Sequence, residues 1–469
     1  NAGGTVALNG ATVTTTGAQT YNDAVVLGAD TTLAATTATF NDTITGAYGL
    51  TITGNAVFGN ATADTVTLTG TNKALSVSGT STINANITTT GGQTYTGATT
   101  LGAIVTLSAS SITTGSTFAA GTYALTMITD AISLGGALSG SAALVIQPKT
   151  DATTIGLGSS ITSTSCGGAA CSLALDDTEL GRLADGFLSI AIGSTTGTGA
   201  IAINYTTPYT FADPVTIRSK ATSGGGSITA SSALASSTNS LTLSTYGAVS
   251  VASITSGTLA ITGTGITLNG NITTSGTQTY TGAVTLGGSV TAASTGGSST
   301  GNTISFGSSV NGAQALVVDA GVGAISFAST VGNSTGLASI SLTTSHATGI
   351  TLTGNITTTG TQTYTGAVRL ASNTTLTTTN SNVQFGGTLN SDATTRTLTI
   401  AAGTGAVTFT GAVGGSAALG ATAITAATTT NSSTWVGNST LGITGNAVVN
   451  GAISGITTLS VSGTSSIAA

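Results

Sequence analysis

The feature that most constrains this chain is an internal repeat. Residues 271–286 read NITTSGTQTYTGAVTL and residues 355–370 read NITTTGTQTYTGAVRL, which are identical at 14 of 16 positions. A third copy begins at Asn86 and a fainter fourth copy at Thr12. Self-similarity of this kind is typical of architectures in which one small unit stacks on the next. We therefore expect the chain to grow in one dimension instead of forming several globular domains.

A finer period follows the aromatic residues. A Tyr or Phe, often with Val, Leu or Ile a few residues later, returns at many single steps of 18 to 26 residues. These steps predict coils of about 20–22 residues, so the 84 residues between Asn271 and Asn355 would be four coils. Equivalent residues of stacked coils lie above one another, so the rings should form an interior ladder. The predicted ladder comprises Tyr21, Phe40, Phe58, Tyr95, Phe118, Phe211, Tyr280, Phe306, Phe327, Tyr364, Phe385, Phe409 and Trp435.

Short alternating segments occupy each coil. Thr65–Thr69 reads TVTLT and Thr397–Ile400 reads TLTI, the period of a strand with one buried face. Gly, Asn and Ser-Gly pairs separate these segments, as turns require. Only three prolines occur, which suits a backbone whose N–H groups are nearly all paired. Stacking at about 4.8 Å would bury the apolar face of each coil. The sequence thus predicts an all-β parallel β-solenoid in a single elongated rod.

The composition narrows the possible partners. Charged residues make up only 4% of the chain, against about a quarter in ordinary proteins, so Thr, Ser, Asn and Gly must cover the surface. The chain is 39% hydrophobic with a mean hydropathy of +0.41, which argues against disorder. Its net charge of −6 and scattered Lys and Arg exclude a nucleic-acid surface. No run of about 18 apolar residues predicts insertion into a membrane.

One segment interrupts the repeating pattern. Cys166 and Cys171 enclose a Gly-Gly-Ala-Ala loop and are expected to form a disulfide in an oxidising compartment, with two free thiols as the alternative. The following residues predict a short helical turn with Asp177 as a potential N-cap and Gly186 as its stop. The predicted organisation has solenoid coils at 1–165, the Cys loop and helical interruption at 166–190, and further coils at 191–469. The last region is expected to continue the same rod.

A resemblance to a known family rests on the residues around this interruption. The run LDDTELGRLADGF at 175–187 is followed by SIAIG at 189–193, GAIAI at 199–203 and FADPVTI at 211–217. In this run the chain resembles the filamentous-haemagglutinin-like and autotransporter-type surface proteins of bacteria. That resemblance implies a right-handed parallel β-helix, export by a type V route, an extracellular or outer-surface location, and a role as an adhesin or in a biofilm matrix.

The final residues predict self-assembly. Leu459–Ile467 reads LSVSGTSSI and matches LSVSGTSTI at Leu75–Ile83, a segment that is soon followed by the copy at Asn86. The pattern could therefore resume in a second copy stacked head to tail, and lateral association stays open. We expect the chain to be its own partner, with the glycans or surfaces of host or neighbouring cells as further partners. The predicted role is a secreted structural or adhesive solenoid.

No catalytic, cofactor-binding or metal site is predicted. Glu179 is the only glutamate, and the sole acidic concentration is Asp176, Asp177, Glu179 and Asp185 with Arg182, which is typical of a helix cap with surface ion pairs. Other aspartates, including Asp213, are isolated in the sequence, and His346 has the surroundings of a turn residue. Two alternatives stay open: a carbohydrate-active β-helix enzyme, and a Thr-rich solenoid that binds ice or another crystal surface.

Overall fold

A computed structural model describes residues 3–61, 63–161, 171–222, 224–296 and 302–467. The chain is a parallel β-solenoid of about 22 turns, nearly all β, so the predicted fold class is confirmed. It divides into two compact units, Asn1–Gly247 and Ala248–Ala469. Most strand pairs between neighbouring turns join residues 17 to 27 apart, a wider range than the predicted coil length. The pairs β20 (Ala143–Gln147) with β23 (Ser189–Ser194) and β21 (Ile155–Leu157) with β24 (Ile201–Ile203) join residues 46 apart.

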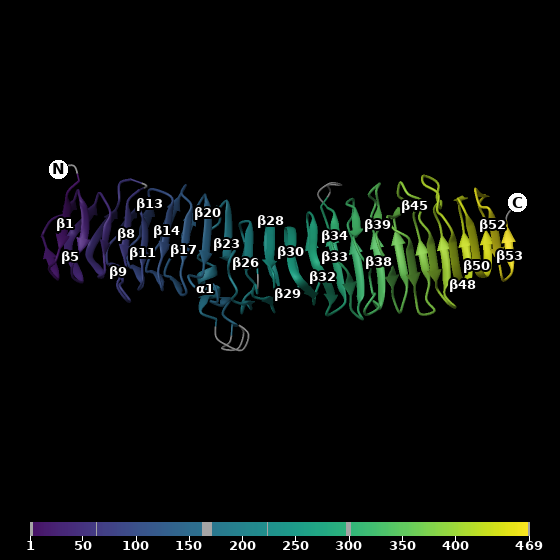
Figure 1. The fold of residues 1–469 in the computed structure, drawn as a ribbon, viewed down its shortest axis with the longest axis horizontal. Helices are drawn as coiled ribbons and strands as arrows, with labels where there is room; N and C mark the ends of the chain where they lie inside the picture. The colour runs from purple at the N-terminus through teal and green to yellow at the C-terminus, as the bar shows by residue number, and fades with distance from the viewer. Residues whose placement is uncertain (1–2, 62, 162–170, 223, 297–301, 468–469) are drawn as a thin grey trace. The chain divides into compact units, whose positions relative to one another are not determined.

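Figure 1 shows successive strands of the first unit stacked one beside the next. Strand pairing assigns the strands of each regular turn to three faces, which we number 1 to 3. Face 1 holds β1 (Thr5–Leu8), β4 (Ala24–Leu27), β6 (Ile44–Gly46), β8 (Thr65–Leu68), β11 (Asn86–Thr89), β14 (Val105–Ser108), β17 (Leu125–Ile128), β20 (Ala143–Gln147), β23 (Ser189–Ser194) and β26 (Val215–Ser219). Face 2 holds β2 (Thr12–Thr14), the first parts of β5 (Thr31–Phe40) and β7 (Leu50–Phe58), β9 (Leu75–Val77), β12 (Gln93–Tyr95), β15 (Ile112–Thr114) and β18 (Ile132–Leu134). Face 3 holds β3 (Gln19–Tyr21), the second parts of β5 and β7, β10 (Ser81–Ile83), β13 (Thr99–Leu101), β16 (Phe118–Gly121) and β19 (Leu138–Gly140).

The last part of the first unit is less regular. Its remaining strands are β21 (Ile155–Leu157), β22 (Leu173–Leu175), β24 (Ile201–Ile203), β25 (Thr210–Phe211), β27 (Ile228–Ala230) and β28 (Leu234–Thr245). The helix α1 (Asp177–Leu180) follows β22. Its N-cap is Asp176 and not the predicted Asp177, because the Asp176 side chain accepts from the backbone N–H of Glu179 in a capping box. The helix ends at Gly181, before the predicted stop at Gly186.

The second unit is also three-sided, and we number its faces 4 to 6. Face 4 holds the first part of β30 (Ile254–Leu268), β31 (Ile272–Thr274), β33 (Val290–Ser294), β36 (Ala315–Asp319), β38 (Ser339–Thr343), β41 (Gln362–Thr365), β44 (Val383–Phe385), β47 (Ala406–Phe409), the last parts of β48 (Thr422–Asn431) and β50 (Thr440–Val449), and β53 (Ser465–Ile467). Face 5 holds the middle of β30, the first part of β32 (Gln278–Leu286), β34 (Ile304–Phe306), β37 (Ile325–Phe327), β39 (Ile350–Leu352), β42 (Val368–Leu370), β45 (Leu389–Ser391), β49 (Trp435–Val436) and β51 (Ile453–Ser454). Face 6 holds β29 (Ala248–Val251), the last parts of β30 and β32, β35 (Val310–Asn311), β40 (Ile356–Thr357), β43 (Thr374–Thr377), β46 (Leu398–Ala401), the first parts of β48 and β50, and β52 (Thr458–Val461).

Glycine forms some of the corners at which one strand continues from face to face, as in β7 and β32. Gly54 in β7 has φ +129° and Gly282 in β32 has φ +138°, a region that side chains with a Cβ rarely adopt. A Cβ at Gly54 would collide with the carbonyl oxygen of Ala35 in the turn below, and one at Gly282 would collide with that of Gly263. The Thr-Gly dipeptide of the repeat therefore marks a corner.

Copies of the repeat lie on different faces. The copy at Asn271 begins on face 4 with β31, whereas the copy at Asn355 begins on face 6 with β40. The 84 residues between them are therefore three turns and two further faces, and the predicted four coils are wrong. In the first unit the copy at Thr12 begins on face 2 and the copy at Asn86 on face 1. The repeating unit is therefore a strand with its corner, and this unit can begin on different faces of the solenoid.

Candidate functional site

The repeat builds a buried polar contact inside the solenoid. Tyr95 donates from its hydroxyl to Gln93 Oε1 at 3.1 Å, and Gln93 Nε2 donates to the carbonyl oxygens of Ile87 and Ser108, both at 3.0 Å. The hydroxyl of Thr89 donates to the carbonyl oxygen of Gly91 at 2.8 Å. Each polar group of this corner is thus paired where water cannot reach it.

The same contact recurs in the other three copies. Tyr21, Tyr280 and Tyr364 donate to the glutamine two residues earlier, at 3.0, 2.8 and 2.9 Å. Burial raises the pKa of all four tyrosines, so the hydroxyls stay protonated and can donate. The most distinctive motif of the sequence therefore holds the fold together.

The predicted aromatic ladder is divided into separate stacks. Three sets of three rings pack face to face, with ring centroids 4.8 to 5.8 Å apart. The stacks are Tyr21–Phe40–Phe58 on face 3, Tyr280–Phe306–Phe327 on face 5 and Tyr364–Phe385–Phe409 on face 4. The sequence steps Phe58 to Tyr95 and Phe327 to Tyr364 each lead to another face, so no ring is missing from a continuous ladder.

Four predicted ladder residues have other strand neighbours. Tyr95 lies between Val77 and Thr114, and Phe118 lies between Thr99 and Leu138. Phe211 and Trp435 also have no ring as a strand neighbour: Phe211 pairs with Ser236, and Trp435 lies between Val413 and Ile453. Trp435 meets Phe409 edge to face at 5.1 Å from the neighbouring face, while Asn431 occupies the ladder position next to Phe409. All four rings are nevertheless buried.

The remaining predicted residues lie apart from one another. Cys166 falls outside the described residues, so its pairing with Cys171 stays a prediction. His346 is half-buried in the loop between β38 and β39, where its Nδ1 accepts from the backbone N–H of Thr348 at 3.0 Å.

The acidic group organises the irregular part of the first unit. Glu179 accepts from the backbone N–H of Leu134 at 3.0 Å, and Asp177 accepts from three backbone N–H groups, which lower its pKa against the opposing effect of desolvation. Asp213, which looked isolated in the sequence, is buried beside Asp185 and accepts from the N–H of Gly186 at 3.0 Å. Burial, reinforced by the Asp185 carboxylate, raises the pKa of Asp213. These carboxylates act as caps and loop anchors.

A row of hydroxyls, one from each turn, runs along the outside of face 2. Each member is the central or outward residue of its strand, and strand pairing places each one directly above the last. None of these side-chain hydroxyls makes a hydrogen bond to protein within the described residues. We call this set the hydroxyl row; it consists of Thr12, Thr32, Thr51, Ser76, Thr94, Thr113 and Ser133.

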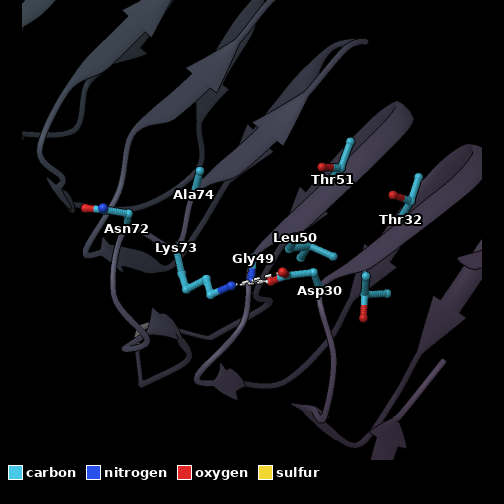
Figure 2. A pocket seen from close by; sticks show the side chains of 9 residues that line it. Asp30, Thr32, Gly49, Leu50, Thr51, Asn72, Lys73 and Ala74 are labelled. Carbon is cyan, nitrogen blue, oxygen red and sulfur yellow. Dashed lines mark hydrogen bonds and ion pairs between the residues drawn. The ribbon is translucent and has the colours of Figure 1, made fainter. Parts of the chain in front are cut away.

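A shallow pocket of about 260 Å³ adjoins the hydroxyl row (Figure 2). Thr32 and Thr51 belong to both, and their side chains lie on neighbouring strands in the close-up view. Beside them, Lys73 Nζ contacts both carboxylate oxygens of Asp30 at 2.9 Å. The backbone N–H of Gly49 also donates to Asp30 at 2.8 Å, and these contacts hold the pKa of Asp30 below its usual range.

An exposed aromatic ring flanks this pocket. Lys73 Nζ lies 5.7 Å from the ring centroid of Tyr48, a side chain that is 37% exposed. Sequence reasoning missed the pocket and the hydroxyl row alike. The alternating threonines of the sequence predict faces rich in hydroxyl groups, but only the strand register shows which hydroxyls are stacked in one row.

The comparisons with known proteins add no family. No protein-family model matches the chain, and neither a curated protein nor a solved structure matches it. The described part of the chain has no helix with the length and apolar character needed to cross a membrane. Within the same residues, no group of three or more His, Cys, Asp or Glu side chains could hold a metal ion.

Proposed function

We propose that this chain is a secreted surface protein of a bacterium, of the filamentous-haemagglutinin-like or autotransporter type, with a structural and adhesive role and no catalytic one. The observation that carries the proposal is the hydroxyl row: seven uncharged, outward hydroxyls held in line by a buried, hydrogen-bonded interior. A regular surface of this kind can meet another surface at many points. Each contact is weak, but many contacts made together give strong attachment.

The interior suits exposure outside a cell. Parallel pairing occupies the backbone between turns, and stacks such as Tyr280–Phe306–Phe327 fill the core with flat rings. A protease needs an extended, unpaired backbone segment, and a solenoid offers such segments mainly at its loops. A solenoid with few exposed Lys and Arg would therefore persist where proteases are present.

Location and adhesion are tested on the producing cells. An antibody against the chain should label intact cells or their culture medium, and a strain that lacks the gene should attach less to a substratum or to neighbouring cells. Complementation with the full gene should restore attachment. Labelling only after the cells are lysed, or unchanged attachment in the deletion strain, would contradict the proposed role.

Self-assembly forms the second part of the proposal. The matching segments at Leu75 and Leu459 both fold into two short strands on consecutive faces, β9 and β10 in the first case and β52 and β53 in the second. In the proposed assembly, a turn of a second copy would lie over Leu459 as β12 lies over the fully buried Leu75.

Sedimentation and negative-stain images test this assembly. The purified chain is expected to form species larger than 44.5 kDa in a concentration-dependent way. Leu459→Lys should shift the distribution toward the monomer because it places a charge at the contact, while Leu188→Lys, at an exposed site away from the final turn, should leave it unchanged. A monomer at all concentrations would rule out assembly without touching the adhesive role.

A further inference from the structure

The hydroxyl row has the properties of a surface prepared for a ligand. Among the described residues, no hydroxyl of the row bonds to its neighbour on the next strand, about 4.8 Å away. Each member of the row in β7, β9, β12, β15 and β18 stands between two buried residues, so its direction is fixed. Most members are threonines, whose branched side chains have few rotamers. Their hydroxyls can each donate and accept, and no protein group uses that capacity.

The pocket supplies an independent feature at the same place. It shares Thr32 and Thr51 with the row, and it brings an ion pair, Asp30 with Lys73, next to the exposed ring of Tyr48. An aromatic face with hydroxyl, carboxylate and ammonium groups close by offers stacking and hydrogen bonds together. Because the ion pair is internally neutral, the pocket selects neither an anion nor a cation.

We propose that the hydroxyl row and its pocket bind a neutral, extended polysaccharide of the β-linked type, with the polymer lying along the row and one sugar ring in the pocket against Tyr48. The row carries no charge, which favours a neutral ligand. Its members are in register on successive turns and repeat at the strand spacing, which favours an extended polymer with hydroxyls in a regular line over a coiled one. This inference rests on the proposed adhesive function and names its surface and partner.

Two other partners fit less well. A protein interface has an apolar centre rich in aromatic residues and arginine, and the hydroxyl row has neither. An ice surface could match the row but would make no use of the pocket with its ion pair, or of the Tyr48 ring next to Lys73. Tyr48 therefore separates a polysaccharide from ice.

Binding isotherms of the purified chain on insoluble polymers test the proposal. Cellulose and chitin serve as extended β-linked probes, and starch granules serve as a coiled α-linked control. The triple variant Thr51→Val, Ser76→Ala, Thr94→Val removes three consecutive hydroxyls and keeps the strand-forming side-chain shapes. The matched control is Thr45→Val, Thr67→Val, Thr88→Val, which removes three consecutive outward hydroxyls from face 1. Circular dichroism verifies that all variants are folded.

The unaltered chain should bind cellulose or chitin and leave starch unbound. The triple variant should bind at least about tenfold more weakly, because several hydrogen bonds are lost together. Tyr48→Ala should weaken binding as well, and the control variant should bind like the unaltered chain. Equal loss in the control, or no binding to either β-linked polymer, would overturn the proposal. Thermal hysteresis that depends on the row but not on Tyr48 would also overturn it and assign the row to ice. Labelling of intact cells is independent of all these outcomes.

Discussion

Tyr95 and Tyr280 occupy the same place in two copies of the repeat but have different surroundings. Both donate to a glutamine two residues earlier and both are fully buried. Phe306 stacks on Tyr280 with ring centroids 4.8 Å apart and an interplanar angle of 9°. Tyr95 instead has Thr114 at the corresponding position of the next turn. The polar contact is therefore a property of the motif, while the ring stack depends on the turns above it.

The largest difference between the two sites is expected on removal of the stacking partner. Phe306→Ala should reduce the local stability of the turns around β32 to β37 by about 3–5 kcal/mol, because it leaves a cavity and removes two ring contacts. Thr114→Ala beside Tyr95 should have a much smaller effect. Native-state hydrogen exchange is the suitable measurement, since stacked repeats need not unfold in one step. Similar losses of protection in the two variants would show that stacking adds nothing to the burial of Tyr280.

This contrast marks how far sequence reasoning reaches. Alternation in segments such as Thr65–Thr69 and turn residues between them predict a parallel solenoid, since both depend on local chemistry. They cannot predict the face that receives a given segment. The step from Thr32 to Thr51 is 19 residues and the step from Thr51 to Ser76 is 25, although all three lie in one row. Because the loops absorb these differences, the hydroxyl row and the division of the aromatic ladder became visible only with the strand register.

The pocket could not be predicted from the sequence either, because its residues come from different turns. Lys73 and Asp30 are 43 residues apart in the chain. They meet because Thr31, Leu50 and Leu75 occupy one position in three successive turns. Lys73 reaches back to Asp30 from the loop before Leu75, in which Asn72 has φ +54°. Single charges of this kind have no periodic signal in a sequence that contains few of them.

An intermediate effect, equal at the two sites, is expected on removal of the glutamine. Gln93→Leu and Gln278→Leu both leave a buried tyrosine hydroxyl and at least one backbone carbonyl without a partner. An unpaired buried group costs about 1–3 kcal/mol, so each variant should lose protection in its own turn by at least that amount. Hydrogen exchange on both variants provides the comparison. A clearly larger loss in Gln278→Leu would mean that the stack strengthens the polar contact, and the two features would no longer be separable.

The smallest effect concerns the hydroxyls of the two tyrosines and depends on pH. Tyr95→Phe and Tyr280→Phe should each cost about 1 kcal/mol near pH 7, the value of one buried hydrogen bond. Burial raises the pKa of both hydroxyls in the folded chain, whereas in the unfolded chain they ionise near pH 10.

Above pH 10 the unfolded chain thus loses protons that the folded chain keeps, and each buried tyrosine lowers the stability as the pH rises, by about 1.4 kcal/mol for each pH unit. Each phenylalanine variant lacks one of these hydroxyls, so its stability does not fall by that amount. Urea midpoints followed by circular dichroism from pH 7 to 11 should therefore show the variants below the unaltered chain at neutral pH and level with it or above it near pH 11. Parallel curves would mean that these hydroxyls ionise in the folded chain as readily as in water, and that the buried contact shared by the two copies opens before the turns do.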